Sequence, residues 1–592
     1  MLRQFSSHLC SVLAPGILAA AVSAAAGPLS VGELNYNDPE GGDYDFIELV
    51  NTGTVAQALN GLNFTRGIGY TFAATDPLAP GERIVIARDR PKFLARYGSS
   101  FRLAAGTFSG GFSAEGERVT VADGSGQTVL DFTFGSSGSW PSRPNGLGST
   151  LEPVDPSGDL NDPDNWRPSS EWLGSPGRAG AGPQRRVAIN EVLAHTDPPF
   201  EDAIEFLNLT DETIRLDGWY LSNERAEPTK YKIPANTVLT PRGRLVLYEY
   251  QFDPAVPPAG QKAFRFNSAQ GDEAVLMSVN SSGRPEYWMD VVSFGATANG
   301  VSLGRFPEGT GPLVPMIRQT FGTLVSMGMP AEFLTEFRTG RGGTNSGPLI
   351  GPVVVRRIQY FPAGDGDEFV ELESIHPVTV PLFDPNFPTN TWRLRGGADF
   401  DLPPGISLDP GARLMIVGTD PGAFRTQHQI PASIPVLGPW TNSLANDGDR
   451  VVLYKPDPPQ DETHPDAGFV PYILVEAVEF TAGAPWPVEA AGGGPALLRK
   501  DLKVFGNDPS NWTVDAVTPP VAPDLEIRIE EAAVRLHFDA ASGRTYRLQS
   551  RPMDLTAAWS ELGLIPTPPA GGSVVVDVPT SGGARLLRVL VE

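Results

Sequence analysis

The chain has almost no cysteine, little histidine and few long apolar runs. One cysteine, Cys10, stands among 592 residues, so no intramolecular disulfide can form. The six histidines are scattered, and no two have the spacing typical of ligands to one metal. A Gly-x-Ser-x-Gly elbow, a phosphate-binding loop and a dinucleotide fingerprint are also absent. The usual signs of catalysis are therefore missing, although a catalytic triad or a glycosidase-type carboxylate pair assembled across domains stays open.

Positive charge is also scarce. The chain carries 69 acidic and 45 basic residues, a net charge of −24. Nucleic-acid binding depends on clustered cations that displace counterions from phosphates. We therefore expect no nucleic-acid partner.

The one long apolar stretch lies at the N-terminus. It runs from residue 9 to residue 26 after Arg3 and ends in small residues, which predicts a signal peptide over residues 1–26. The alternative is a retained membrane anchor, but Pro15 and Gly16 interrupt a run that is already short for spanning. We expect a bacterial protein that is secreted, periplasmic or on the cell surface, with no transmembrane segment after cleavage.

The rest of the chain repeats two short phrases in the same order three times. The first phrase contains Glu48, Glu205 and Glu371, and the second contains Arg83, Arg244 and Arg413. The copies are about 160 residues apart, which is the size of a domain and too long for a solenoid repeat. This predicts three copies of one domain.

Gly and Pro punctuate short runs rich in β-branched and aromatic residues, which is typical of an all-β protein. We expect three tandem β-sandwiches and a small C-terminal β domain. Their predicted boundaries, at Gly- and Pro-rich linkers, are 27–183, 184–350, 351–522 and 523–592.

Local signals place several elements. Buried strands are expected at Arg83–Ala87, Arg244–Glu249 and Arg413–Gly418. Single helical turns are expected at Pro91–Tyr97 and Pro421–Gln427, because each follows an Asp that can cap it and begins with Pro.

The first and third copies each end with two tryptophans, and the two tryptophans are the same number of residues apart in both copies. They are Trp140 and Trp166 in the first copy and Trp486 and Trp512 in the third. The equal spacing predicts a tail that docks on its own domain by two indole rings. The second copy lacks both residues, so its tail, Phe321–Ser346, has to pack differently.

These phrases resemble the lamin tail domain. The residues that carry the resemblance are Asp45–Asn51, Leu78–Arg83 and Gly116–Val119, with their counterparts in the third copy. The second copy shares only its first half, through Ile189–Leu193 and Asp217–Trp219. The resemblance implies an immunoglobulin-like fold without catalytic residues. The last domain is similar to C-terminal β modules of exported bacterial proteins, which implies a location only.

The repeated Glu and Arg are the first candidate site. We expect Glu48 with Arg83, Glu205 with Arg244 and Glu371 with Arg413 to form partly buried ion pairs that fix strand register. The alternative is that the three glutamates mark a ligand site.

Acidic loops are the candidate for a cofactor. Asp155, Asp159, Asn161, Asp162 and Asp164 lie within ten positions, and Asp365, Asp367 and Glu368 cluster in the third copy. Oxygen ligands at this density can hold calcium. The alternative is Asx turns that bond the local backbone. No other cofactor is expected.

Tyr36, Tyr44 and Tyr360 follow the first predicted strands, where they could stack on a sugar or pack in the core. Taken together, the sequence predicts a non-catalytic binding or scaffolding protein of the cell surface or extracellular matrix, with an unknown protein or polysaccharide ligand. The alternatives are a secreted hydrolase or polysaccharide-targeting accessory protein, and a calcium-dependent adhesin. The oligomeric state is left open.

Overall fold

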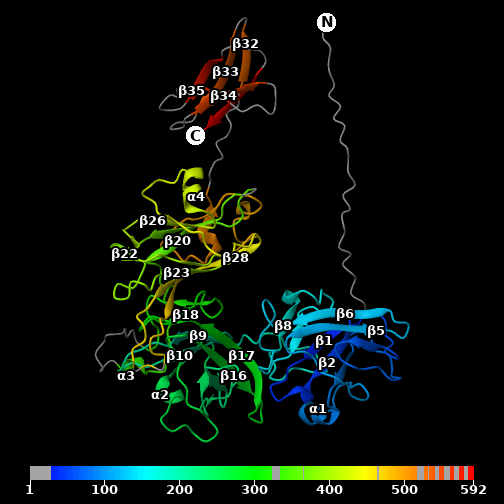
Figure 1. Ribbon diagram of the computed structural model, residues 1–592. Coiled ribbons are helices and arrows are strands. Elements are labelled where there is room, and N and C mark those ends of the chain that lie inside the picture. The colour runs from blue at the N-terminus through cyan, green and yellow to red at the C-terminus, as the bar shows by residue number, and fades with distance from the viewer. Residues whose placement is uncertain are drawn as a thin grey trace. The chain divides into compact units, whose positions relative to one another are not determined.

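The structure is a computed structural model that describes residues 29–322, 334–363, 366–462, 464 and 466–515, and six C-terminal strands (Figure 1). The predicted signal peptide, residues 1–26, and Asp365 lie outside the described residues. The chain divides into two compact units, Met1–Leu349 with Pro456–Leu474, and Ile350–Lys455 with Val475–Glu592. No helix in the described part of the chain has the length and apolar character needed to cross a membrane.

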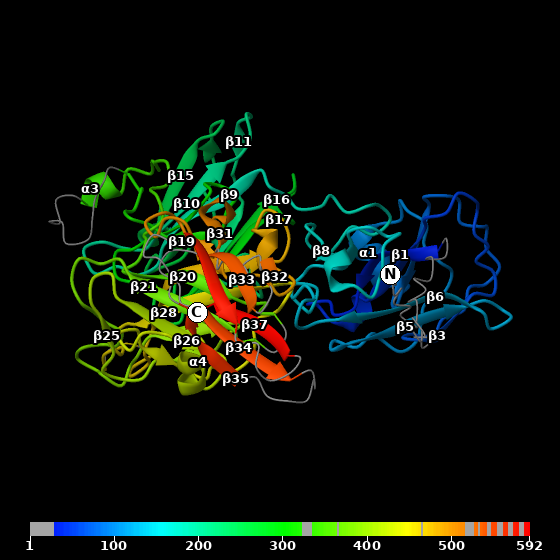
Figure 2. The ribbon, with the colours of Figure 1, turned by 90° about the horizontal axis from the view of Figure 1, so that it is seen from above.

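The first repeat is a sandwich of two sheets, blue to cyan in Figure 2, with strand orders β4-β2-β1-β7-β8 and β3-β5-β6. Its core lies between the sheets and includes Val31, Val119 and Phe132. Its elements are β1 (Leu29–Asn35), η1 (Gly42–Tyr44), β2 (Phe46–Asn51), β3 (Asn63–Arg66), β4 (Arg83–Ala87), α1 (Arg90–Tyr97), β5 (Gly116–Ala122), β6 (Thr128–Gly135), β7 (Leu151–Pro153), η2 (Pro163–Asn165) and β8 (Trp166–Pro168).

The second repeat has the same two main sheets, β15-β10-β9-β18-β19 and β13-β12-β16-β17, and a small pair, β11-β14. Its elements are β9 (Val187–Leu193), β10 (Ala203–Asn208), β11 (Ile214–Arg215), β12 (Tyr220–Ser222), β13 (Tyr231–Lys232), β14 (Val238–Leu239), β15 (Arg244–Tyr248), α2 (Glu249–Phe252), β16 (Asp272–Val279), β17 (Pro285–Phe294), β18 (Leu303–Arg305), β19 (Leu313–Pro315) and α3 (Leu334–Phe337).

The third repeat has sheets β27-β26-β21-β20-β30-β31 and β24-β23-β28-β29, with the pair β22-β25. Its elements are β20 (Val353–Gln359), β21 (Phe369–Ser374), β22 (Val380–Pro381), β23 (Arg393–Gly396), β24 (Phe400–Asp401), β25 (Ser407–Leu408), β26 (Arg413–Val417), α4 (Pro421–Gln427), β27 (Val436–Leu437), β28 (Gly448–Pro456), β29 (Tyr472–Thr481), η4 (Val488–Ala490), β30 (Leu497–Arg499), η5 (Pro509–Asn511) and β31 (Trp512–Val514).

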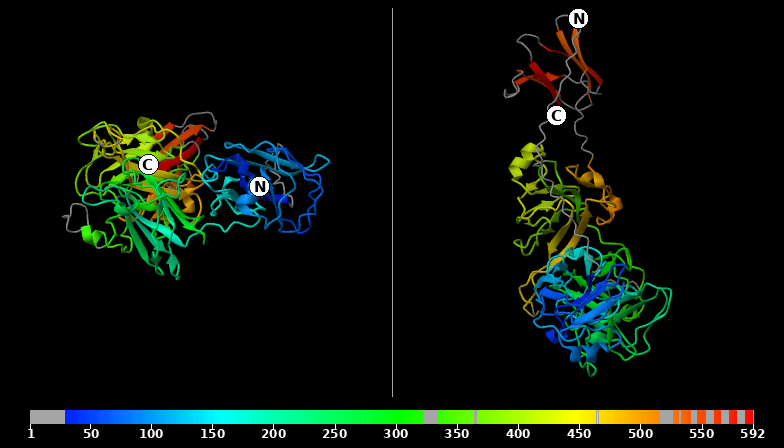
Figure 3. Two further views of the ribbon diagram at one scale, coloured as in Figure 1. Left: turned by 90° about the horizontal axis from the view of Figure 1, so that it is seen from below. Right: turned by 90° about the vertical axis from the view of Figure 1, so that its right-hand side faces the viewer.

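The C-terminal strands, orange to red in Figure 3, form two three-stranded sheets, β32-β33-β36 and β35-β34-β37. They are β32 (Glu526–Glu530), β33 (Ala533–Ala540), β34 (Tyr546–Pro552), β35 (Ser560–Ile565), β36 (Gly572–Val578) and β37 (Arg585–Val591). The predicted all-β fold with three tandem immunoglobulin-like sandwiches and a last β module is confirmed.

The three sandwiches share one strand plan. In each, the first strand lies between the second strand and a late short strand, giving β2-β1-β7, β10-β9-β18 and β21-β20-β30. The first strand also skips one residue in each copy, at Gly32, Asn190 and Arg356. Such β-bulges re-aim the neighbouring side chains. The copies therefore share a local irregularity as well as a topology.

The predicted helical turns are confirmed. Asp89 Oδ1 accepts a hydrogen bond from Lys92 N at 3.0 Å at the start of α1, and Asp420 Oδ1 accepts one from Ala423 N at 2.8 Å at the start of α4. Each cap satisfies an amide that the first helical turn leaves free.

Candidate ligand-binding site

The repeated glutamate lies on the second strand of each sandwich and is completely buried. In the first repeat, Arg83 Nη1 lies 2.5 Å from Glu48 Oε1, so the predicted pair forms. The other carboxylate oxygen of Glu48 accepts a hydrogen bond from Gly177 N at 2.5 Å. Both oxygens are thus held by groups of the same repeat.

The second repeat brings the same residue types together more loosely. Arg244 Nε is 3.7 Å from Glu205 Oε1, while Arg244 Nη2 approaches Glu308 Oε1 to 2.7 Å. Glu205 Oε1 instead accepts a hydrogen bond from Asn190 Nδ2 at 2.7 Å. Arg244 therefore forms a closer ion pair with Glu308 than with its predicted partner, Glu205.

In the third repeat a different arginine takes the main role. Arg413 Nη1 is 3.9 Å from Glu371 Oε1, whereas Arg357 Nε is only 2.6 Å from Glu371 Oε2. Arg357 belongs to the first strand and lies directly opposite Glu371 in the register. Sequence reasoning missed Arg357, because the bulge that sets this register leaves no signal in the repeated phrases.

That register places glutamate opposite glutamate in the first two repeats, as Glu33 with Glu48 and Glu191 with Glu205. Burial raises the pKa of both Glu33 and Glu48. Burial likewise raises the pKa of Glu191 to about 7 and that of Glu205 to about 9. A buried carboxylic acid is favoured over a buried carboxylate, so Glu205 holds a proton at neutral pH.

The Gly- and Pro-rich segment from Gly174 to Pro183, which the sequence predicts to be a linker, is bonded to the first repeat. Its backbone amides bond the buried carboxylates: Ser175 N donates to Glu33 Oε1 at 2.7 Å, and Ala181 N donates to Glu171 Oε1 at 3.0 Å. The bonds to Glu33 and, from Gly177 N, to Glu48 fasten the segment to β1 and β2. The glutamates therefore order a strap of chain, which is a structural role.

The acidic loop proposed for calcium uses its oxygens on its own backbone. Asp155 Oδ1 accepts from Ser157 N at 2.8 Å, Asp159 Oδ1 from Asn161 N at 2.9 Å and Asp162 Oδ1 from Asp164 N at 3.0 Å. This is the geometry of the Asx-turn alternative. Among the described residues, no group of three or more His, Cys, Asp or Glu is placed to hold a metal ion.

The paired tryptophans meet inside their own repeats. The ring centroids of Trp140 and Trp166 are 6.0 Å apart, and those of Trp486 and Trp512 are 5.8 Å apart. The indole N–H of Trp512 donates to Gly506 O at 2.7 Å. The rings thus anchor the tail loop of each repeat.

The same loops protect an edge strand. Asn161 Oδ1 accepts from Thr133 N on β6 at 3.0 Å, and Asn507 Oδ1 accepts from Glu479 N on β29 at 2.8 Å. An edge strand with free amides can pair with another chain. Each asparagine accepts a hydrogen bond from one of these amides, so that amide is not free to pair with another chain.

The second repeat covers its edge strand by other means. Trp288 N on β17 donates to Ser170 O at 2.8 Å, and Trp172 N donates to Glu286 O at 2.8 Å. The rings of Trp172 and Trp288 lie 5.5 Å apart. A segment from the end of the first repeat therefore pairs with this edge.

Two of the three candidate tyrosines are not exposed. Tyr36 is 2% exposed and Tyr360 1% exposed, and both pack in the cores of their repeats. Tyr44 is half-buried, with the guanidinium of Arg96 centred 3.3 Å from its ring. Of the two roles that the sequence allows Tyr36 and Tyr360, core packing is therefore confirmed, and stacking on a sugar is wrong for these two residues.

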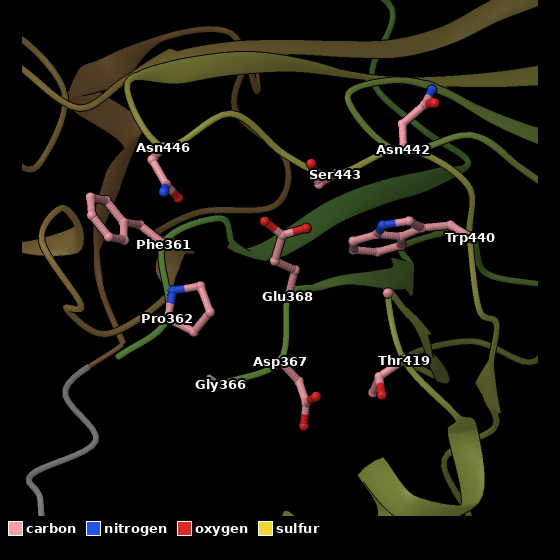
Figure 4. Close-up of a pocket in the computed structure, with 11 residues that line it drawn as sticks. Phe361, Pro362, Gly366, Asp367, Glu368, Thr419, Trp440, Asn442, Ser443 and Asn446 are labelled. Atoms are coloured by element: carbon pink, nitrogen blue, oxygen red, sulfur yellow. The ribbon is translucent and has the colours of Figure 1, made fainter. Parts of the chain in front are cut away.

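An open pocket of about 360 Å³ lies in the third repeat, at the start of β21. Figure 4 shows the Glu368 carboxylate between the Phe361 and Pro362 side and the indole of Trp440, with Ser443 above it. Further polar lining comes from Asp367, Thr419, Asn442 and Asn446. Sequence reasoning singled out Asp367 and Glu368 as calcium ligands but missed Trp440, which lies far away in sequence.

Two carboxylates of this pocket differ in their partners. Glu368 Oε2 accepts a hydrogen bond from Leu444 N at 3.1 Å, and burial raises the pKa of Glu368. Asp367 Oδ2 lies 3.1 Å from Nε2 of His428. Aromatic rings beside carboxylate, amide and hydroxyl groups can bind a cation or a polyol.

Comparison with known families identifies one part of the chain. Residues 181–295 match the family model of the lamin tail domain, so this segment is similar to that immunoglobulin-like family. The match falls on the second repeat and ends just after β17, whereas sequence reasoning found the fuller resemblance in the first and third repeats. The family is typically non-catalytic. No curated protein and no solved structure matches the chain.

Proposed function

We propose that the protein is a non-catalytic binding or scaffolding protein, exported to the bacterial surface or the extracellular matrix. The observation that carries the proposal is the use of the buried ionisable residues. Glu33, Glu48, Glu191 and Glu205 accept hydrogen bonds from backbone amides, a hydroxyl group and a side-chain amide of their own repeats. Groups committed to holding the fold are poor candidates for acid or base catalysis, which needs a group that reaches a substrate.

Repetition favours the same conclusion. Three sandwiches in one chain can present several surfaces to one partner, and linked sites gain avidity from effective concentration. The open pocket of the third repeat is a candidate for such a surface. The acidic surface favours a partner that is neutral or basic.

The test has two arms on the same full-length preparation. A protein and glycan binding array is expected to give saturable binding, and an activity screen against polysaccharides, esters and nucleic acids is expected to give no turnover. Turnover that is abolished by one carboxylate or serine substitution would contradict the proposal and favour a secreted hydrolase. A melting temperature that falls on chelation would instead favour the calcium-dependent adhesin, because a ligand of the folded state stabilises it.

A further inference from the structure

The three repeats place an acidic residue just before the second strand, and its main chain is held in the same way each time. Its carbonyl oxygen accepts a hydrogen bond from the amide that follows the strand carrying the repeated arginine. The three pairs are Arg88 N with Asp45 O at 3.0 Å, Glu249 N with Asp202 O at 2.8 Å and Gly418 N with Glu368 O at 3.1 Å. Arg88, Glu249 and Gly418 are therefore equivalent positions.

The first repeat fills this position with its own cation. Arg88 Nη1 lies 3.3 Å from Asp45 Oδ2 and 3.4 Å from Gly42 O. The guanidinium also lies against Gly111, where a Cβ atom would come within 2.7 Å of Nη1. The Asp45 carboxylate, the Gly42 carbonyl and Gly111 together form a binding site for one guanidinium group.

In the second repeat, the carboxylate of the equivalent acid, Asp202, accepts hydrogen bonds from two groups of the same repeat. Asp202 Oδ2 accepts from Phe266 N at 3.3 Å, and Asp202 Oδ1 accepts from Thr196 Oγ1 at 3.4 Å. The equivalent side chain is Glu249, whose Oε2 accepts from Asp202 N at 3.2 Å. Arg265 of the same repeat lies 3.9 Å from Glu249 Oε1 through its Nε and 2.6 Å from Asp253 Oδ2 through its Nη2.

The third repeat keeps the acid and lacks the arginine. Gly418 places no side chain over Glu368, and no cation of the described residues forms an ion pair with the Glu368 carboxylate. Gly418 and Glu368 both line the open pocket. A Cβ atom at Gly418 would lie 3.1 Å from Nε1 of Trp440, so glycine also makes room for the indole.

We propose that this pocket binds the arginine side chain of a basic segment of a partner protein, in the place that Arg88 occupies in the first repeat. The inference rests on the proposed binding function and names its ligand class. The guanidinium group pairs with the Glu368 carboxylate and lies against the Trp440 indole, which supplies a cation–π contact. Among the described residues, Asp367 also lines the pocket, with its Oδ2 3.1 Å from His428 Nε2, and the charge of Asp449 contributes to the raised pKa of Glu368.

The experiment titrates a short glycine-arginine-glycine peptide into the full chain and follows binding by calorimetry. A matched peptide with citrulline keeps the shape of the side chain and removes its charge. We expect saturable binding of one arginine peptide per chain and at least tenfold weaker binding of the citrulline peptide. Equal binding of the two peptides, or binding of soluble oligosaccharides at the same pocket in place of the peptide, would overturn the inference.

Three variants locate the site. Glu368→Gln keeps the size of the side chain and is expected to weaken binding at least tenfold. Gly418→Arg is expected to abolish binding by supplying the cation from within, and Arg88→Gly is expected to raise the stoichiometry from one peptide to two. Circular dichroism checks folding, and Glu368→Gln alone decides the matter if Gly418→Arg does not fold. Unchanged affinity in Glu368→Gln would overturn the assignment.

The outcomes separate this inference from the function on which it rests. If the arginine peptide does not bind while the protein and glycan array yields other ligands, the inference fails and the binding function stands. If the activity screen finds turnover that one substitution abolishes, the binding function itself fails.

Discussion

The second and third repeats place different partners opposite the same buried glutamate. Glu205 faces Glu191 across the strand pair, whereas Glu371 faces Arg357. The fold is the same, but the second repeat buries two carboxylic acids with raised pKa values, whereas the third repeat buries an ion pair. The comparison shows that the sandwich plan specifies a bulge and a buried polar position, and that each repeat satisfies the position with its own chemistry.

The largest effect is expected from removing the cation of the third repeat. Arg357→Gln would leave Glu371 buried beside weaker partners, and breaking a buried pair by removing one member costs about 3–5 kcal/mol. Urea unfolding, followed by hydrogen exchange in β20 and β21, measures this loss. Arg413→Gln is the matched control, because Arg413 is 42% exposed and 3.9 Å from Glu371, and it is expected to cost at most about 1 kcal/mol. Equal losses for the two variants would contradict the comparison.

The second effect is a pH dependence of the second repeat. Folding raises the pKa of Glu191 from 4.5 to about 7 and that of Glu205 from 4.5 to about 9, so the folded state binds more protons than the unfolded state in this range. The free energy of unfolding is therefore largest near pH 4.5 and falls as the pH rises towards 9, by at most about 1.4 kcal/mol per pH unit for each group.

Hydrogen exchange in β9 and β10, corrected for the chemical exchange rate, measures this dependence. Burial also raises the pKa of Asp202 to about 8, which adds to the same slope. Glu205→Gln removes one of these titrating groups, and its slope is expected to be flatter than that of the wild type between pH 7 and 9. A second repeat whose stability rises with pH over this window would refute the assignment of buried protons.

The smallest effect is expected in the tail loops. Asn511 is 6% exposed, and its side chain donates to Asp501 O at 2.9 Å and accepts from Asp501 N at 3.0 Å. Asn511→Ala leaves these groups unsatisfied and is expected to cost about 1–3 kcal/mol in the third repeat. Asn165→Ala, at the equivalent but more exposed position, is expected to cost less, since water replaces the lost bonds. Melting curves of the two variants are compared directly, and a larger loss for Asn165→Ala would count against this account of the loops.

The sequence predicts the parts of the fold that depend on local chemistry. The buried strand Arg83–Ala87 and the helix Pro421–Gln427 lie where the apolar pattern and the Asp-Pro start predict them. The pairing of Trp140 with Trp166 follows from equal spacing in two copies. These signals lie within a short window or recur in register.

Features that depend on non-local pairing escaped prediction. Arg357 faces Glu371 only because the first strand skips Arg356, and the pocket joins Glu368 to Trp440 through contacts between distant segments. The sequence allows Tyr36 an exposed loop position, but its ring lies in the core directly after β1. The sequence predicts a linker at Ser175, because the bonds of Ser175 N to Glu33 and of Gly177 N to Glu48 join residues more than a hundred positions apart.

An experimental structure of the full chain tests the central claim most directly, by showing the register of the first and second strands in each repeat. The account predicts a one-residue skip at Gly32, Asn190 and Arg356, with Glu48 opposite Glu33, Glu205 opposite Glu191 and Glu371 opposite Arg357. Finding the three glutamates on strands with unlike neighbours would contradict the claim that one sandwich plan is used three times.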